Sequence, residues 1–181
     1  MHQQLKEFVK RVCKQTADWP EPTQTQLLEI ANEIRRIYEM YPFDESKYPK
    51  AGATQQFMYP IAVCEPSGPS LYLVSEAPGT TSPPHEHQTW AIIVGLFGSE
   101  INTLYQRTLG DNRMVNKAEE VVVGAGAFFC MQASDVHSTR VGLFQPTYHL
   151  HLYGRPLFHL PNFESRCFEV TPADSPARLV S

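Results

Sequence analysis

Two histidines, His85 and His87, stand two residues apart in the stretch PPHEHQTW. Successive side chains of a strand point to opposite faces, so in a strand these two imidazoles share one face and Glu86 lies on the other. If that face is the interior of a β-barrel, the two imidazole nitrogens supply two ligands of a metal site, and neutral imidazole suits zinc, iron, copper or nickel. An isolated HxH pair is better explained by surface or hydrogen-bonded histidines, because short motifs often arise by chance.

Further side chains of the same kind follow along the chain. His137 lies in QASDVHSTRV, and His149, His151 and Tyr153 alternate with leucines in YHLHLY. Two imidazoles and a phenol on one face of a buried strand need hydrogen-bond partners or another role. A core of hydrogen-bonded histidines is the alternative, but the convergence of ligand-type residues in these clusters favours a metal site.

The elements that must position these residues fall into two parts. The first forty residues have apolar side chains at helical spacing, and Thr23 with Gln26 can form a capping box at the start of the second helix. After YPFDESKYPK, short β-rich runs are separated by Gly, Pro, Ser or Asn. These runs are FMYPIAVC, LYLVSEA, TWAIIVGLF, INTLYQRTL, EEVVV, AFFCM, TRVGLF and YHLHLY.

The order of these runs predicts the fold class. Since no helical pattern separates them, a βαβ sheet is disfavoured, and a jelly-roll or double-stranded β-helix barrel fits instead. We therefore predict a mainly β protein of one domain, in which two N-terminal α-helices precede the barrel. Residues 1–45 form the helical segment packed on the barrel, and residues 46–181 form the barrel with a C-terminal extension.

Composition limits the function classes. The 181 residues carry a formal net charge of -4 without a cluster of Lys and Arg, which argues against nucleic acid or an anionic membrane as partner. No apolar run is long enough for a transmembrane helix, and the amphipathic N-terminus does not look like a signal peptide. The four cysteines lie far apart without a CxxC motif, so we expect no disulfide framework and predict a reducing, cytoplasmic location.

These motifs resemble those of the cupin superfamily. The first cupin motif, G-x5-H-x-H-x3-E-x6-G, is met by Gly79, His85, His87 and Gly98, with Ala91 at the Glu position. The second, G-x5-P-x-G-x2-H, is met by Gly126 and His137, with Gln132 and Ser134 in place of Pro and Gly. The resemblance covers about residues 56 to 157 and implies the cupin double-stranded β-helix barrel.

Within the cupins, this chain resembles the thiol dioxygenases, because it lacks the Glu of the first motif. HEHQTW is similar to the HxHxxW form of bacterial members of the cysteine dioxygenase family, such as 3-mercaptopropionate dioxygenase. That family binds Fe(II) through three histidines and has a Ser-His-Tyr triad of the form S-x-H-x-Y. The resemblance implies Fe(II) at His85, His87 and His137, and catalytic roles for Tyr153 and His151. The Ser of the triad does not carry over, because His149 replaces it.

Three neutral imidazoles leave a bound Fe(II) with its full charge, which favours an anionic thiolate donor. The expected substrates are a small thiol and O2, and the product is a sulfinate. Tyr153 would hydrogen-bond the oxygen, His151 would orient Tyr153, and His149 would extend this relay or act as a second acid or base. Without the resemblance, Tyr153 is as well explained as a core phenol with a backbone partner.

The substrate anchor does not carry over from the family. Cysteine dioxygenases hold the substrate carboxylate with an Arg on an early strand, whereas QQFMYPIAV has Met58 or Tyr59 near that place. Arg140 and Arg155 are basic residues elsewhere in the barrel that could substitute. Two other functions therefore stay open: a three-His cupin acting on a non-thiol substrate such as a β-diketone, and a metal- or ligand-binding cupin without turnover.

Overall fold

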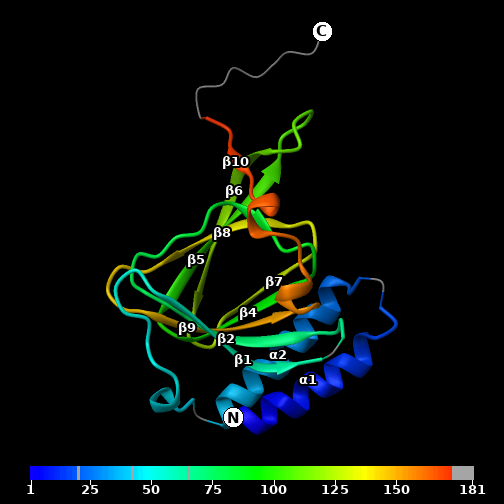
Figure 1. Cartoon of the computed structure of the whole chain (residues 1–181), viewed down its shortest axis with the longest axis vertical. Helices are drawn as coiled ribbons and strands as arrows, with labels where there is room; N and C mark the ends of the chain where they lie inside the picture. The colour runs from blue at the N-terminus through cyan, green and yellow to red at the C-terminus, as the bar shows by residue number, and fades with distance from the viewer. Residues whose placement is uncertain (20, 42, 65, 173–181) are drawn as a thin grey trace.

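The computed structural model describes residues 1–19, 21–41, 43–64 and 66–172 (Figure 1). The last residues of the expected C-terminal extension, 173–181, lie outside the described residues. Two helices come first, α1 (His2–Thr16) and α2 (Gln24–Met40). The strands are β1 (Gln56–Val63), β2 (Ser70–Glu76), β3 (His85–Glu86), β4 (Ala91–Phe97), β5 (Ser99–Arg107), β6 (Met114–Gly124), β7 (Phe128–Met131), β8 (Val136–Val141), β9 (Thr147–Tyr153) and β10 (Glu169–Val170). Short 3-10 helices are η1 (Glu45–Lys47), η2 (Leu157–His159) and η3 (Phe163–Arg166).

The strands form two five-stranded sheets that face each other (Figure 1). One sheet has the order β1-β2-β9-β4-β7 and the other β10-β6-β5-β8-β3. The pairs are antiparallel except for β10 beside β6. The predicted fold class, a mainly β jelly roll preceded by two helices, is confirmed.

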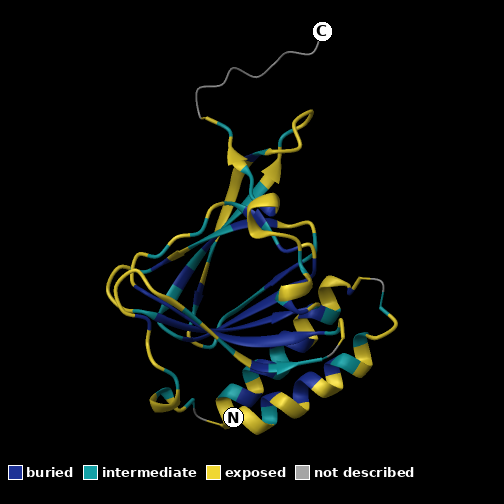
Figure 2. Ribbon diagram, viewed as in Figure 1, coloured by how far each residue is buried: buried dark blue, intermediate teal, exposed yellow. Residues whose placement is uncertain are grey.

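The helices cover the outer face of the first sheet, where α1 packs on β1 and α2 on β4 and β7 (Figure 1). Their apolar residues point toward that sheet, and their polar faces are exposed (Figure 2). The predicted capping box is present: the Thr23 hydroxyl accepts from the Gln26 N–H, and the Gln26 side chain accepts from the Thr23 N–H. The buried helix residues are Leu5, Phe8, Val9, Val12, Leu27, Ile30, Ala31, Ile34 and Ile37.

Strand β9 lies in the middle of the first sheet and is buried on both faces. On the helix side, Tyr148, Leu150 and Leu152 join the larger apolar core. The alternate positions face the space between the two sheets, where Tyr153 packs in a smaller apolar cluster. His149 and His151 share that inner face, so one strand places two imidazoles and a phenol inside the barrel.

The structure differs from the sequence prediction at the cysteines. Cys13 of α1 and Cys64, which follows β1, form a disulfide, although no disulfide framework was expected. They are 51 residues apart in the sequence, but the packing of α1 on β1 brings their Cα atoms within 6.3 Å, inside the range that a disulfide spans. Disulfides are predicted from sequence by the regular cysteine spacing of small secreted proteins, and a single bridge between two distant cysteines has no such spacing.

Two short strands, β3 and β10, lie outside the β-rich runs that the sequence shows. Each has only two residues and lies at an edge of the second sheet. Two residues are too few for a periodic pattern, so neighbouring strands rather than local preference determine them. Among the described residues, no helix combines the length and apolar character needed to cross a membrane.

Candidate metal centre

His85 and His137 are partners in the second sheet. They lie opposite each other where β3 pairs with β8, and their ring centroids are 4.6 Å apart. His87 comes just after β3, where Gln88 has a positive φ of 54° and its N–H donates to the Ala133 carbonyl at 3.0 Å. This turn directs His87 back toward the other two rings, at 4.9 Å from the centroid of His85 and 5.1 Å from that of His137.

The three histidines form a compact cluster of potential ligands. One nitrogen of each lies within 4.8 Å of the others, and all three side chains are buried. The Nε2 atoms of His87 and His137 are 2.9 Å apart. Side chains that the sequence separates widely are thus brought together as the motif spacing predicts, in a donor set of three imidazole nitrogens.

Hydrogen bonds on the far side of two rings determine which nitrogen faces the cluster. The Asn102 amide N–H donates to Glu100 Oε1 at 2.9 Å, so Asn102 Oδ1 accepts from His137 Nδ1, also at 2.9 Å. His85 Nδ1 donates to the Pro83 carbonyl at 2.9 Å. With Nδ1 protonated, Nε2 of both rings carries the lone pair, which is how proteins orient metal-binding imidazoles.

Burial and mutual repulsion keep these rings neutral. Desolvation lowers the pKa of His85, and desolvation together with the neighbouring histidines holds the pKa values of His87 and His137 well below the usual range. Neutral imidazole is the form that binds a cation, so three lone pairs facing one point fit a transition metal. The residues present therefore fit the ion that the sequence motif implies.

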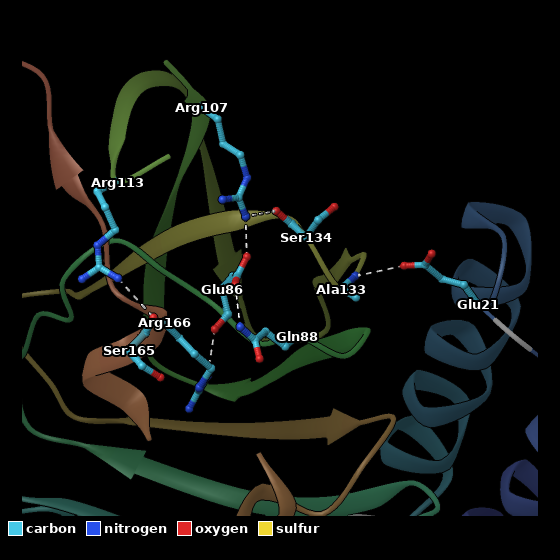
Figure 3. A network of polar contacts seen from close by, with 9 residues as sticks. All are labelled: Glu21, Glu86, Gln88, Arg107, Arg113, Ala133, Ser134, Ser165 and Arg166. Atoms are coloured by element: carbon cyan, nitrogen blue, oxygen red, sulfur yellow. Dashed lines mark hydrogen bonds and ion pairs between the residues drawn. The ribbon is translucent and has the colours of Figure 1, made fainter. Parts of the chain in front are cut away.

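The side chain of Glu86 points toward Arg107 and Gln88 (Figure 3). Its carboxylate pairs with Arg107 and accepts a hydrogen bond from Gln88 Nε2 at 2.8 Å. Arg107 also donates to the Ser134 carbonyl at 3.2 Å, and its guanidinium lies over the ring of Phe168. This network connects β3 to β5 and to the β7–β8 turn, so the strand that carries His85 and precedes His87 is held from outside.

The C-terminal segment holds β3 from a second direction. Arg166 of η3 donates from Nη1 to the Glu86 carbonyl at 2.8 Å, as Figure 3 shows, and from Nε to the Pro161 carbonyl at 3.1 Å. The Phe168 N–H donates to the Pro84 carbonyl at 2.8 Å. Residues far along the chain from the HxH motif therefore complete its surroundings.

His151 and Tyr153 adjoin the three histidines from the first sheet. His151 Nδ1 and the Tyr153 hydroxyl share a hydrogen bond of 3.0 Å, and the Tyr153 ring lies 5.0 Å from the ring of His87. Burial lowers the pKa of His151 to about 4 and raises the pKa of Tyr153, so the imidazole stays neutral and the phenol stays protonated. The expected pair of His151 and Tyr153 is in hydrogen-bond contact.

His149 lies deeper, and its neighbour was not identified from the sequence. Its Nδ1 is 3.3 Å from Glu100 Oε2, and both side chains are almost completely buried. Glu100, His149 and His151 form a second cluster whose potential ligand atoms lie within 4.8 Å of one another. The available signal was the alternation of Glu100 and Asn102 at the start of β5, where an inward strand face carries polar residues.

Two carboxyl groups lie close together beside this second cluster. Burial and the charge of Glu100 raise the pKa of Glu76 to about 8, and Gln56 Nε2 donates to Glu76 at 2.8 Å. Burial would raise the pKa of Glu100 as well, but His149 and the other neighbours hold it at about 2. Glu76 is therefore the carboxyl of the pair that retains its proton at neutral pH.

A cavity of about 390 Å³ opens onto both clusters. Of the described residues that line it, Arg166 is the one with a positive side chain. Arg140 and Arg155 are exposed and do not line it, so neither takes the place of the family's early-strand Arg. Met58 lines the cavity, whereas the Tyr59 hydroxyl donates to the Pro49 carbonyl. Arg166 was not predicted because it lies in the tail, outside the motif region.

The comparisons with known proteins concern the fold. No protein-family model matches the chain, and no curated protein matches it. Similar solved structures include a cupin superfamily protein from Desulfitobacterium hafniense, with 14% identity over 62% of this chain and 88% of that one and a TM-score of 0.48. An oxalate oxidase in complex with glycolate has 17% identity over 62% and 59% of the two chains, with a TM-score of 0.46. A polyketide cyclase from Streptomyces resistomycificus has 19% identity over 67% and 77%, with a TM-score of 0.45.

Proposed function

We propose that this protein is an Fe(II)-dependent dioxygenase that converts a small thiol to its sulfinate with O2. The observation that carries the proposal is the donor set: three buried, neutral imidazoles converge directly beside the hydrogen-bonded pair of His151 and Tyr153. The overall step consumes one thiolate and one O2, and both oxygen atoms are transferred to sulfur.

His85, His87 and His137 would hold the ion. When bound there, Fe(II) supplies the redox chemistry that joins the thiolate to O2. The protein contributes neutral ligands, which leave the positive charge of the ion uncompensated, and a buried site that excludes bulk water. An anionic thiolate is favoured at such a site over a neutral donor.

Tyr153 is the hydrogen-bond donor of the site. Its raised pKa keeps the hydroxyl protonated, and the contact with His151 fixes the direction of the phenol. In the proposal, Tyr153 donates to the reacting oxygen atoms and His151 is a positioning residue. His149 lies beside His151 on the same face of β9. It differs from the triad Ser because its imidazole lies next to Glu100 and so adds a carboxylate to the polar groups of the site.

Arg166 indicates which thiol is bound. Two of its nitrogens, Nε and Nη1, donate to backbone carbonyls, and Nη2 has no hydrogen-bond partner among the described residues. A guanidinium at the wall of the cavity favours a substrate with an anionic group at the end remote from sulfur. We therefore propose a small mercapto-carboxylate as the substrate.

Turnover of matched thiols tests the proposal. Iron-loaded protein is supplied with 3-mercaptopropionate, 2-mercaptoethanol, cysteamine or a β-diketone, while O2 uptake and sulfinate are measured. We expect the highest kcat/KM for 3-mercaptopropionate. O2 uptake with the β-diketone alone would support a non-thiol cupin enzyme, and metal binding without any uptake would support a binding protein.

Two variants separate the roles of metal and substrate residues. His137→Asn should lose the iron of the three-histidine cluster and all turnover. Arg166→Gln should keep iron and raise KM for 3-mercaptopropionate about 10-fold or more, since a charge-assisted hydrogen bond is lost, with little change for 2-mercaptoethanol. An equal loss for both thiols would assign Arg166 only to holding β3 in place.

A further inference from the structure

We propose that the second cluster, Glu100, His149 and His151, is a second cation site of this protein, suited to a divalent first-row transition metal. The cluster joins the two sheets of the barrel: Glu100 comes from β5, and both histidines come from β9. His149 and His151 are two residues apart on one strand and face the same side. One potential ligand atom of each residue lies within 4.8 Å of the others.

The polar atoms of this cluster lack partners to an unusual degree. Glu100 Oε2, both ring nitrogens of His149, and His151 Nε2 are buried and make no hydrogen bond to any described residue. The side chains of Glu100, His149 and His151 are 0%, 1% and 8% exposed. Buried polar atoms of folded proteins nearly always have partners, and several such atoms around one point indicate a missing ligand. A cation would accept lone pairs from all three residues at once.

The hydrogen bonds that do exist leave these atoms available. Glu100 Oε1 accepts from Asn102, which leaves Oε2 as the free carboxylate oxygen. His151 Nδ1 is engaged with the Tyr153 hydroxyl, which leaves Nε2. Two imidazole nitrogens and one carboxylate oxygen form a mixed donor set that zinc, iron, cobalt and manganese all accept. The negative charge of Glu100 further favours a divalent ion in a buried site.

A cation can reach the cluster from the same cavity as the substrate, because Glu100 and His151 both line it. The two clusters are also connected through hydrogen bonds. Glu100 holds Asn102, and Asn102 holds His137 of the three-histidine cluster. A second ion would fix the position of Glu100, at one end of this series of hydrogen bonds. It would also leave His151 with its proton on Nδ1, donating to Tyr153, so that the hydroxyl hydrogen of Tyr153 points to the cavity.

The competing occupant of the cluster is a proton. A protonated His149 would form an ion pair with Glu100, because Nδ1 and Oε2 are 3.3 Å apart. This pair would give a partner to both of these atoms. That arrangement leaves His151 Nε2 without a partner, whereas a cation bound by both rings does not. Counting metal ions distinguishes the two possibilities without any measurement of turnover.

The test is the stoichiometry of Co²⁺ bound by the full-length chain after treatment with a chelator. We expect two equivalents for the native protein and one for His149→Asn, for Glu100→Gln and for His137→Asn. His159→Asn, an exposed histidine outside both clusters, is the matched control and should keep two equivalents. A single equivalent in the native protein overturns the proposal, and so do two equivalents in both His149→Asn and Glu100→Gln.

Crystals of the native protein soaked in Co²⁺ provide a measurement that does not depend on the folding of variants. We expect an anomalous-scattering peak among Glu100, His149 and His151, in addition to one among the three histidines. A peak at the three histidines alone overturns the second site. Because neither experiment involves a thiol or O2, the second site stands or falls independently of the proposed dioxygenase activity.

Discussion

Asn102 places the amide oxygen of its side chain 2.9 Å from Nδ1 of His137, and its amide nitrogen 2.9 Å from Glu100. This single side chain therefore determines which nitrogen of His137 faces the three-histidine cluster. It also holds one oxygen of the only buried carboxylate found in either metal cluster of the described residues. Its contacts are the basis of the first prediction.

Asn102→Ala should weaken Co²⁺ binding at the three-histidine cluster by about 10- to 100-fold, the usual effect of losing the outer partner of a ligating histidine. The reason is that His137 loses the acceptor that keeps its proton on Nδ1. Thr103→Ala on the same strand changes the opposite face, where Thr103 contacts Glu120, and should leave the affinity unchanged. Equal affinities of the native protein and Asn102→Ala would contradict an orienting role.

Tyr153→Phe should keep its metal and turn over thiol about 100-fold more slowly, because the hydrogen-bond donor of the site is removed. The matched control is Tyr148→Phe on the opposite face of β9, where the hydroxyl donates to the Tyr48 carbonyl. That variant should lose stability but retain kcat. An unchanged kcat in Tyr153→Phe would assign the phenol to packing.

The stability of the metal-free protein should pass through a maximum near pH 6.5. Below that pH, unfolded histidines bind protons that the buried rings of His85, His87, His137 and His151 do not bind, so the free energy of unfolding rises with pH. Above it, Glu76 keeps a proton up to about pH 8 in the folded state, whereas the unfolded chain has already released it. Stability should therefore fall between about pH 6.5 and 8, by at most roughly 2 kcal/mol.

Glu76→Gln tests the descending limb of this profile. Glutamine cannot release a proton, so denaturant unfolding of the variant should show no fall in stability from pH 6.5 to 8, while the rise below pH 6.5 persists. A fall of the same size in Glu76→Gln and in the native protein would show that another group is responsible.

The disulfide between Cys13 and Cys64 should stabilise the protein through the loop that it closes. For a separation of 51 residues, chain entropy gives a contribution of about 4 kcal/mol. Replacing both cysteines by serine should lower the melting temperature under oxidising conditions and remove the effect of a reducing agent. Cys167→Ser, at a free cysteine, is the control. Free thiols at Cys13 and Cys64 in non-reducing peptide mapping would contradict the bond.

The fold was predictable because its signals are local and repeated. Helical spacing in the first forty residues predicts the buried faces of α1 and α2, and the alternation in YHLHLY predicts the inner face of β9. Both inferences depend on residues within one element, whose period determines which side chains share a face. The HxH spacing also predicts that His85 and His87 lie together, although His87 comes just after β3 and not within it.

The rest of the site depends on contacts between distant elements. Glu100 meets His149 only because two sheets face each other, and Arg166 reaches the cavity only because the C-terminal segment lies against β3. No spacing in the sequence encodes either contact. For the same reason the sequence does not predict the disulfide between Cys13 and Cys64: their proximity results from the packing of a helix on a strand.

The two-residue length of β3 has a consequence for the behaviour of the protein without metal. This edge strand pairs with β8 and carries or adjoins two of the three histidines, so few backbone hydrogen bonds hold it in place. Segments of this kind open locally at a small fraction of the free energy of global unfolding. A bound cation that joins His85 and His87 to His137 links the edge to its neighbour and opposes this opening. Amide hydrogen exchange in residues 84–90 should therefore slow as the metal concentration rises. Exchange in the central strand β9 should instead follow global unfolding. Metal occupancy thus sets the local dynamics of one edge of the barrel.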